Sequence, residues 1–240
     1  MTVFIAGASG ATGKLLVDQL LSMGHQVRAL VRETATLPDS WETNPQLTLI
    51  HGSISEMSPQ VLAPYLQGCQ GIASCLGHNL TLKGVYGKPR KLVTEALRSL
   101  CAAVRILPPE HPMRFVLMNT AGSRNANLRE SLSAGEKLLI GLIRHLLPPH
   151  TDNEQAAEYL RAEIGAGDPQ IEWVVVRPDS LVDHSEVTAY QAFPSPTRSA
   201  LFNPGKTSRI NVGNFMARLL VENELWEQWK GQMPVLYNQS

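Results

Sequence analysis

The chain has 240 residues, and its 21 basic and 21 acidic side chains give a formal net charge of zero. This length can bury a substantial core, and the missing basic excess argues against nucleic acid or an anionic membrane surface as a partner. Three cysteines without a CxxC or Cys/His spacing predict neither a disulfide framework nor a metal site.

The start of the chain and its most apolar segment both fit a cytoplasmic protein. The first apolar run begins at Val3 with no basic segment ahead of it, so we expect no secretory signal. The most apolar segment, residues 134–147, is too short to span a bilayer and contains charged side chains.

The first stretch, TVFIAGASGATG, has the pattern of a strand, a glycine turn and the start of a helix. The first glycine allows a tight reversal, the second lets a pyrophosphate approach the backbone, and the third lets the helix lie close to the strand. The free N–H groups of the helix then point at the phosphates. Glycine turns also occur without any ligand, but this context favours a dinucleotide. The expected binding residues are Gly7, Ser9, Gly10, Ala11, Thr12 and Gly13.

Strand and helix patterns alternate after this turn. Apolar runs predict strands at 25–31, 47–51, 71–76, 114–118 and 172–176, and helical spacing is found at 59–66 and 88–106. Such alternation favours right-handed crossovers and therefore an α/β fold with a doubly wound parallel sheet. We expect one domain over residues 1–240.

The residue that distinguishes NAD from NADP in such sites follows the second strand, about 20 residues past the glycine turn. Arg32 stands where an acidic side chain would hold the ribose of NAD, with Glu33 next to it. A planar guanidinium suits a 2′-phosphate, so NADP(H) is favoured, although a solvated surface arginine is the alternative. Arg28, at an even spacing in the same strand, should lie on the same side.

Two further contacts follow from position alone. Ser53 and Ile54 come after the third strand, where the adenine ring is expected against the sheet edge. Leu76 and Gly77 come after the fourth strand and should run beneath the cofactor, because glycine permits close approach.

The insert at 123–150 contains an apolar helix pattern over residues 134–147. A helix that is apolar on most of its surface must be covered. It is either a core helix or a contact through which the protein forms a homo-oligomer.

The segment 187–211 loses the alternating pattern, and we interpret it as a substrate-covering segment. Its polar, cationic and aromatic side chains suit an anionic, ring-containing small-molecule substrate, although an ordinary ordered loop is the alternative. They are Ser195, Thr197, Arg198, Phe202, Lys206 and Arg209.

The GASGATG turn, Arg32, the NTAG sequence at 119–122 and VVVRP at 174–178 resemble the atypical short-chain dehydrogenase/reductase group. Within it, the closest likeness is to biliverdin reductase B/flavin reductase and NmrA-like NAD(P)H-binding proteins. The resemblance implies a Rossmann-type sheet and NADPH-dependent reduction of flavins or other conjugated rings. It also implies that Asn119, Arg177 and Pro178 lie near the nicotinamide, with Asp179 replacing a small residue of the family pattern.

Catalytic members of the wider superfamily use a serine after the fifth strand and a Tyr-x-x-x-Lys motif on the next long helix. The resemblance puts Thr120 at the serine position, His150 at the tyrosine position and Glu154 at the lysine position. His150 is a candidate proton donor. Glu154 has an alternative role, because Thr151 and Glu154 have the spacing of a helix capping box.

The absent tyrosine and lysine make the usual proton relay for carbonyl reduction doubtful. Our leading hypothesis is an NADP(H)-dependent oxidoreductase that transfers hydride to a flavin-, quinone- or tetrapyrrole-like acceptor. The alternative is a non-catalytic NADP(H)-binding sensor or assembly protein.

Overall fold

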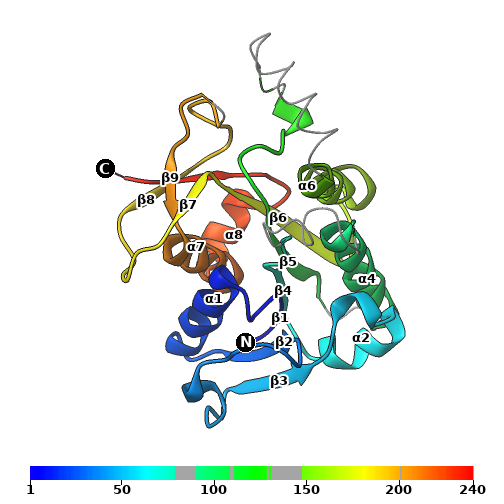
Figure 1. Ribbon diagram of the computed structural model, residues 1–240. Helices are drawn as coiled ribbons and strands as arrows, with labels where there is room; N and C mark the ends of the chain where they lie inside the picture. Colours follow the sequence, from blue (N-terminus) through cyan, green and yellow to red (C-terminus); the bar gives the residue numbers. More distant parts are fainter. Residues whose placement is uncertain (79–89, 109–110, 129, 131–147, 201, 240) are drawn as a thin grey trace.

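The computed structural model describes residues 1–78, 90–108, 111–128, 130, 148–200 and 202–239. Its main feature is a sheet with strand order β3-β2-β1-β4-β5-β6-β10-β8 (Figure 1). The strands are β1 (Thr2–Ala6), β2 (Gln26–Val31), β3 (Leu47–His51), β4 (Gly71–Ser74), β5 (Met113–Met118), β6 (Ile171–Pro178), β8 (Tyr190–Phe193) and β10 (Val235–Asn238). Neighbouring strands are parallel except for the β10–β8 pair.

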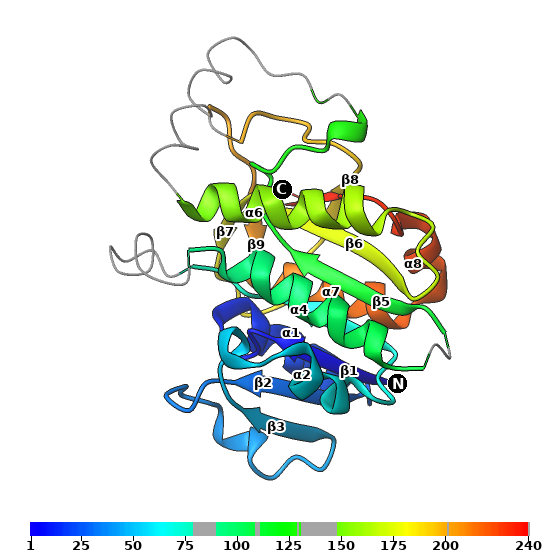
Figure 2. The ribbon, with the colours of Figure 1, turned by 90° about the vertical axis from the view of Figure 1, so that its right-hand side faces the viewer.

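Helices cover both faces of the sheet (Figures 1 and 2). One face carries α1 (Ala11–Ser22), α7 (Arg209–Val221) and α8 (Asn223–Trp229). The other carries α2 (Pro59–Leu66), α4 (Leu92–Ile106) and α6 (Pro148–Glu158), which continues into a π-helical turn, Tyr159–Ile164. Single 3-10 turns occur at Asp39–Trp41, Ile54–Glu56 and Ala126–Leu128.

The alternation of side chains along each strand explains why the sheet has an apolar core on both faces. In β1, Val3 and Ile5 belong to the core cluster beneath α1 and α7, whereas Phe4 and Ala6 belong to the cluster beneath α2 and α4. Successive side chains of a strand point to opposite faces, so a continuous apolar run fills both cores.

The α/β fold class with a doubly wound parallel sheet is confirmed. The helix at 59–66 and the strand at 47–51 have the expected bounds, and the other expected strands differ from the observed ones by one or two residues at their ends. The alternation of strand and helix patterns was therefore a sound guide to this part of the chain.

The last quarter of the chain contains strands that the sequence pattern did not indicate. β8 pairs antiparallel with β10 at the edge of the sheet, while β7 (Ser180–Val182) and β9 (Lys206–Ser208) form a separate parallel pair. These strands have three or four residues each, too short for an alternating pattern to stand out.

The apolar segment 134–147 lies outside the described residues, and so does the homo-oligomer contact expected there. In the part of the chain that the structure describes, no helix is long and apolar enough to cross a membrane.

Candidate functional site

The candidate site lies at the carboxyl edge of the parallel strands. Strand order runs outward from β1 in one direction to β3 and in the other through β4 to β6, so the direction of winding reverses between β1 and β4. In open α/β sheets, ligands bind outside the carboxyl ends of the strands at this switch point.

The glycine turn occupies this switch point, and its geometry requires glycine at two positions. Gly7 has φ +78°, and a Cβ there would lie 2.8 Å from the carbonyl carbon of Cys75. A Cβ on Gly13 would lie 2.1 Å from the carbonyl oxygen of Gly7. The turn is therefore packed against the end of β4 on one side and against α1 on the other.

Helix α1 begins immediately after this turn without a side-chain cap. Its N-cap residue is Gly10, which is exposed, as is Ala11. The first N–H groups of a helix lack intrahelical partners, and they carry the positive end of its dipole. Ser9 is half-buried and Thr12 is buried. This arrangement can bind an anionic group.

Arg32 lies directly after β2 at the same edge. It is exposed, and its guanidinium has no hydrogen bond or ion pair to any other described residue. Glu33 is 3.5 Å from His51 at the end of β3, measured from Oε2 to Nδ1. Arg28 instead donates hydrogen bonds to the carbonyl oxygens of Tyr65 and Gln67, so it caps the C-terminal end of α2 and does not share the position of Arg32.

The segments after β3 and β4 are only partly available to a ligand. Ser53 is half-buried, and its Oγ lies 2.9 Å from Ser55 Oγ. The side chain of Ile54 is buried in the core, because the 3-10 turn that follows Ser53 directs it inward. Leu76 packs partly against the core, and Gly77 is exposed.

The three expected catalytic residues lie together at the end of β5. A Cβ on Gly122 would be 3.3 Å from His150 Cε1 and 3.8 Å from Thr120 Oγ1, so both side chains reach the same glycine. His150 Nε2 lies 3.5 Å from Glu154 Oε1, which makes an ion pair when the imidazole is protonated. An imidazole beside a carboxylate and a hydroxyl can transfer a proton.

The capping-box alternative for Glu154 is wrong. Helix α6 begins at Pro148, so Thr151 lies within the helix and is not its N-cap. Glu154 instead faces His150 one turn away within α6.

The side chain of Asn119 holds α6 against β5. Its Nδ2 donates to the carbonyl oxygen of Asn153 at 2.8 Å, and its Oδ1 accepts from Thr120 N and Ser123 Oγ. It positions Thr120.

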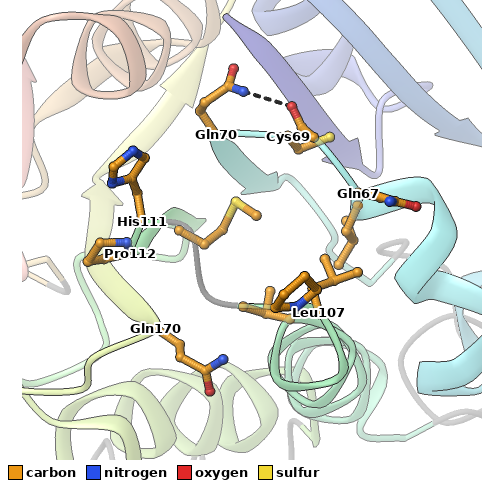
Figure 3. Close-up of a pocket in the computed structure, with 12 residues that line it drawn as sticks. Gln67, Cys69, Gln70, Leu107, His111, Pro112 and Gln170 are labelled. Atoms are coloured by element: carbon orange, nitrogen blue, oxygen red, sulfur yellow. Dashed lines mark hydrogen bonds between the residues drawn. The ribbon is translucent and has the colours of Figure 1, made fainter.

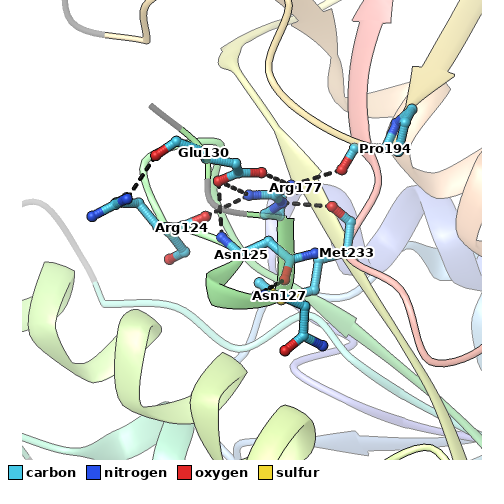
Figure 4. Close-up of polar contacts among 8 residues, drawn as sticks. Arg124, Asn125, Asn127, Glu130, Arg177, Pro194 and Met233 are labelled. Atoms are coloured by element: carbon cyan, nitrogen blue, oxygen red, sulfur yellow. Dashed lines mark hydrogen bonds and ion pairs between the residues drawn. The ribbon is translucent and has the colours of Figure 1, made fainter. Parts of the chain in front are cut away.

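Arg177 is also structural (Figure 4). Its side chain is 0% exposed and pairs with Glu130, which is 8% exposed, at 2.8 Å between Nη2 and Oε1. The guanidinium also donates to the carbonyl oxygens of Ser123, Pro194 and Met233. Every N–H of its fork has an acceptor within the protein, so the expected cofactor contact of Arg177 is wrong.

The neighbours of Arg177 have structural roles as well. Pro178 is buried and pairs with Leu236 of β10 at the end of β6. Asp179 accepts hydrogen bonds from the N–H groups of Ser180 and Gly205. Burial raises the pKa of the Asp179 carboxyl above its usual range.

An aromatic pair that no local sequence pattern indicates packs against Ala121, the residue after Thr120. Phe193 of β8 and Tyr237 of β10 have ring centroids 5.9 Å apart, and they share an apolar cluster with Ala121. The guanidinium of Arg198 lies 5.6 Å from the centroid of the Tyr237 ring. Their separation in the chain, and the pairing of two short strands, explain why no local pattern revealed this pair.

Other residues of segment 187–211 lie on the surface. Phe202 is among the exposed large apolar side chains, and Arg209 pairs with Asp183 at 2.7 Å. Lys206 begins β9 and is exposed.

A pocket on the opposite edge of the sheet is separate from this site (Figure 3). Its lining includes Gln70 just before β4, Met113 at the start of β5 and Gln170 just before β6. It therefore lies at the amino ends of the strands, away from the glycine turn.

Comparison with known proteins identifies the family. The family model described as NAD(P)H-binding matches residues 7–223, which include the glycine turn and α7. The chain belongs to this NAD(P)H-binding family. The resemblance drawn from GASGATG, NTAG and VVVRP is thereby confirmed.

Curated relatives of this NAD(P)H-binding protein match over short segments. An uncharacterized chloroplastic protein of Arabidopsis thaliana is 43% identical over 61 residues, which are 25% of this chain and 21% of the relative. The matched segment thus spans about a fifth of the relative's length.

Solved structures show the same fold as this NAD(P)H-binding protein. A short-chain dehydrogenase/reductase from Veillonella parvula, in complex with NADP, has a TM-score of 0.69 at 17% identity, covering 100% of this chain and 95% of the other. ChuY, an anaerobillin reductase from Escherichia coli O157:H7, has a TM-score of 0.67 at 16% identity, covering 100% and 98%.

Proposed function

We propose that this protein is an NADP(H)-dependent reductase that transfers hydride to a flavin-, quinone- or tetrapyrrole-like acceptor. The observation that carries the proposal is the approach of Thr120 and His150 to the same glycine, Gly122, at the edge of the sheet that holds the glycine turn. A coenzyme site and a proton-transfer group at one edge are what such a reduction needs.

The glycine turn suits the coenzyme diphosphate. The backbone around Gly7 and Gly13 is too close to neighbouring backbone for side chains, and α1 starts with uncapped N–H groups at Gly10. We assign the diphosphate to these groups with Ser9 as an added donor, and the adenine to the backbone near Ser53.

The preference for NADP(H) rests on Arg32. Its guanidinium has no partner among the described residues, and it follows β2, where the ribose of the coenzyme is expected. A planar guanidinium can bind a phosphate through two parallel hydrogen bonds. We therefore assign Arg32 to the 2′-phosphate.

The remaining residues act on the acceptor. A bound nicotinamide supplies hydride. The Thr120 hydroxyl would orient the acceptor by a hydrogen bond, and the His150 imidazole would release a proton from a ring nitrogen to a nitrogen or oxygen atom of the acceptor. Glu154 would hold the imidazole in place. Conjugated rings delocalise the added electrons, so they depend less on a strong enzyme acid than a simple carbonyl does.

Relatives and the aromatic pair support the choice of acceptor. ChuY, which shares the fold, is described as an anaerobillin reductase, and the Veillonella parvula neighbour is described as a complex with NADP. Phe193 is half-buried and packs on the buried ring of Tyr237 in the apolar cluster of Ala121, the residue after Thr120, so its own ring offers apolar surface there. We propose that segment 187–211, including Arg198, covers the acceptor.

The test is a turnover assay with purified protein, NADPH, and a panel of FMN, FAD, a soluble quinone and biliverdin. We expect NADPH oxidation with at least one acceptor, and we expect His150→Gln to lower kcat with little change in the dissociation constant of NADPH. The wild type binding NADPH without oxidising it with any acceptor would reject the reductase and favour the non-catalytic alternative.

A further inference from the structure

A buried carboxylate on α6, Asp152, connects three segments of the chain. Its Oδ2 accepts from the backbone N–H of Val93 and lies 2.8 Å from His78 Nε2, and its Oδ1 accepts from the N–H of Thr94 at 3.0 Å. The side chains of Asp152 and His78 are 0% and 5% exposed. None of these contacts belongs to the coenzyme or acceptor groups assigned above.

Asp152 acts as the cap of a helix that has none of its own. The N-cap residue of α4, Lys91, makes no side-chain capping bond, and the first N–H groups of a helix need an acceptor when they are buried. Ala156 and Ala157 of α6 pack in the same core cluster as Val93 of α4. These small side chains allow the two helices to approach closely enough for the Asp152 carboxylate to reach the N–H groups.

The same carboxylate fixes His78. An ionised carboxylate only accepts hydrogen bonds, so His78 donates from Nε2. Such a charge-assisted bond between two buried side chains holds the imidazole in one orientation. His78 lies three positions after Cys75 in the segment that follows β4, so Asp152 anchors this segment at His78.

The near end of residues 75–78 contacts the glycine turn. The point where a Cβ on Gly7 would stand is 2.9 Å from both the carbonyl oxygen of Cys75 and the backbone nitrogen of Leu76. Backbone this close cannot move toward the turn without displacing it. The position of His78 is therefore linked through two residues to the turn assigned to the diphosphate.

We propose that Asp152 is a positioning residue for the coenzyme, acting through His78 on the segment that packs against the glycine turn. This inference rests on the proposed coenzyme site. Asp152 also ties that site to the proton-transfer group, because α6 carries His150 two residues earlier and Glu154 two residues later. One helix thus sets the position of both halves of the site.

The test measures NADPH dissociation constants for His78→Phe, Asp152→Asn and the double variant, with thermal midpoints recorded in parallel. Phenylalanine keeps the ring volume and removes the Nε2–H donor. We expect each single variant to weaken NADPH binding about tenfold, as for one charge-assisted hydrogen bond. The double variant should bind NADPH no more weakly than the more affected single variant, because both substitutions remove the same contact.

Thr94→Val is the matched control. The Thr94 hydroxyl donates to the carbonyl oxygen of Asp152 at 2.9 Å, so this substitution loosens the docking of α6 on α4 without removing the bond to His78. We expect a lower thermal midpoint with NADPH affinity within about twofold of wild type.

A His78→Phe variant that folds and binds NADPH like the wild type would overturn the inference. A double variant whose loss of NADPH affinity equals the product of the two single losses would overturn it as well. If the wild type binds neither NADPH nor NADH, the proposed function fails and this inference fails with it. Normal wild-type binding with unaffected variants would overturn the inference alone.

Discussion

Replacing Glu130 by alanine should lower the free energy of unfolding by about 3 to 5 kcal/mol, the cost of breaking a buried ion pair by removing one partner. The guanidinium of Arg177 is 0% exposed, and two of its N–H groups point at the Glu130 carboxylate. The backbone N–H of Asn125 donates to the same carboxylate at 2.8 Å.

The magnitude follows from the donors that alanine would leave unpaired. Two N–H groups of Arg177 and one of Asn125 lose their acceptor, and each unsatisfied buried donor costs about 1 to 3 kcal/mol. Glu130 is close to the surface, so water can reach part of the vacated space and reduce the sum. The remaining acceptors of Arg177, three backbone carbonyl oxygens, are not affected.

Urea unfolding followed by tryptophan fluorescence measures this loss, since the chain has four tryptophans. Glu163→Ala is the matched control, because Glu163 pairs with Arg98 at the surface, where both side chains are more than half exposed. That variant should cost less than about 1 kcal/mol. Glu130→Ala unfolding with the same small loss as Glu163→Ala would refute the structural role of Arg177.

Three further predictions test other parts of the structure. Arg32→Asp should weaken NADPH binding about tenfold more than NADH binding, because it replaces a guanidinium that can bind the 2′-phosphate with a carboxylate that repels it. Equal losses of affinity for NADPH and NADH in two titrations would refute the assignment. Gly13→Ala should abolish coenzyme binding or folding, since its Cβ would lie 2.1 Å from a carbonyl oxygen, whereas Gly167→Ala, with no heavy atom within 4 Å of its Cβ, should behave like wild type in both assays. Burial raises the pKa of the Cys75 and Cys101 thiols to about 12 from an ordinary 9.0, so stability should fall as the pH rises above about 9, where the unfolded chain ionises first. Alkylation of both thiols in the native protein at pH 8, as fast as in urea, would contradict that burial.

The site was predictable where the required chemistry is local. Gly7, Gly10 and Gly13 could be recognised from spacing alone, because the turn itself demands two of these glycines: Gly7 has φ +78°, and a Cβ on Gly13 would lie 2.1 Å from the carbonyl oxygen of Gly7. Thr120 and His150 were found by resemblance, and the structure brings both to Gly122.

The site was mispredicted where distant residues compete for a side chain. Arg177 carries polar groups that suit a ligand, but Glu130 and backbone carbonyl oxygens take them up inside the protein. Sequence spacing does not reveal such partners, because the buried polar group binds whatever acceptor folding brings to it.

The sequence by itself determined the order of strands β1 to β6 and of helices α1, α2 and α4, because apolar periodicity records which face of each element is buried. It also determined the glycine turn, since backbone sterics act between neighbouring residues. Only the tertiary structure decided which polar side chains remain available to a ligand. Asp152 is the sharpest example: it lies within a helix, yet it caps α4 and holds His78, 74 residues away in the chain, because packing of α6 on α4 brings its carboxylate there.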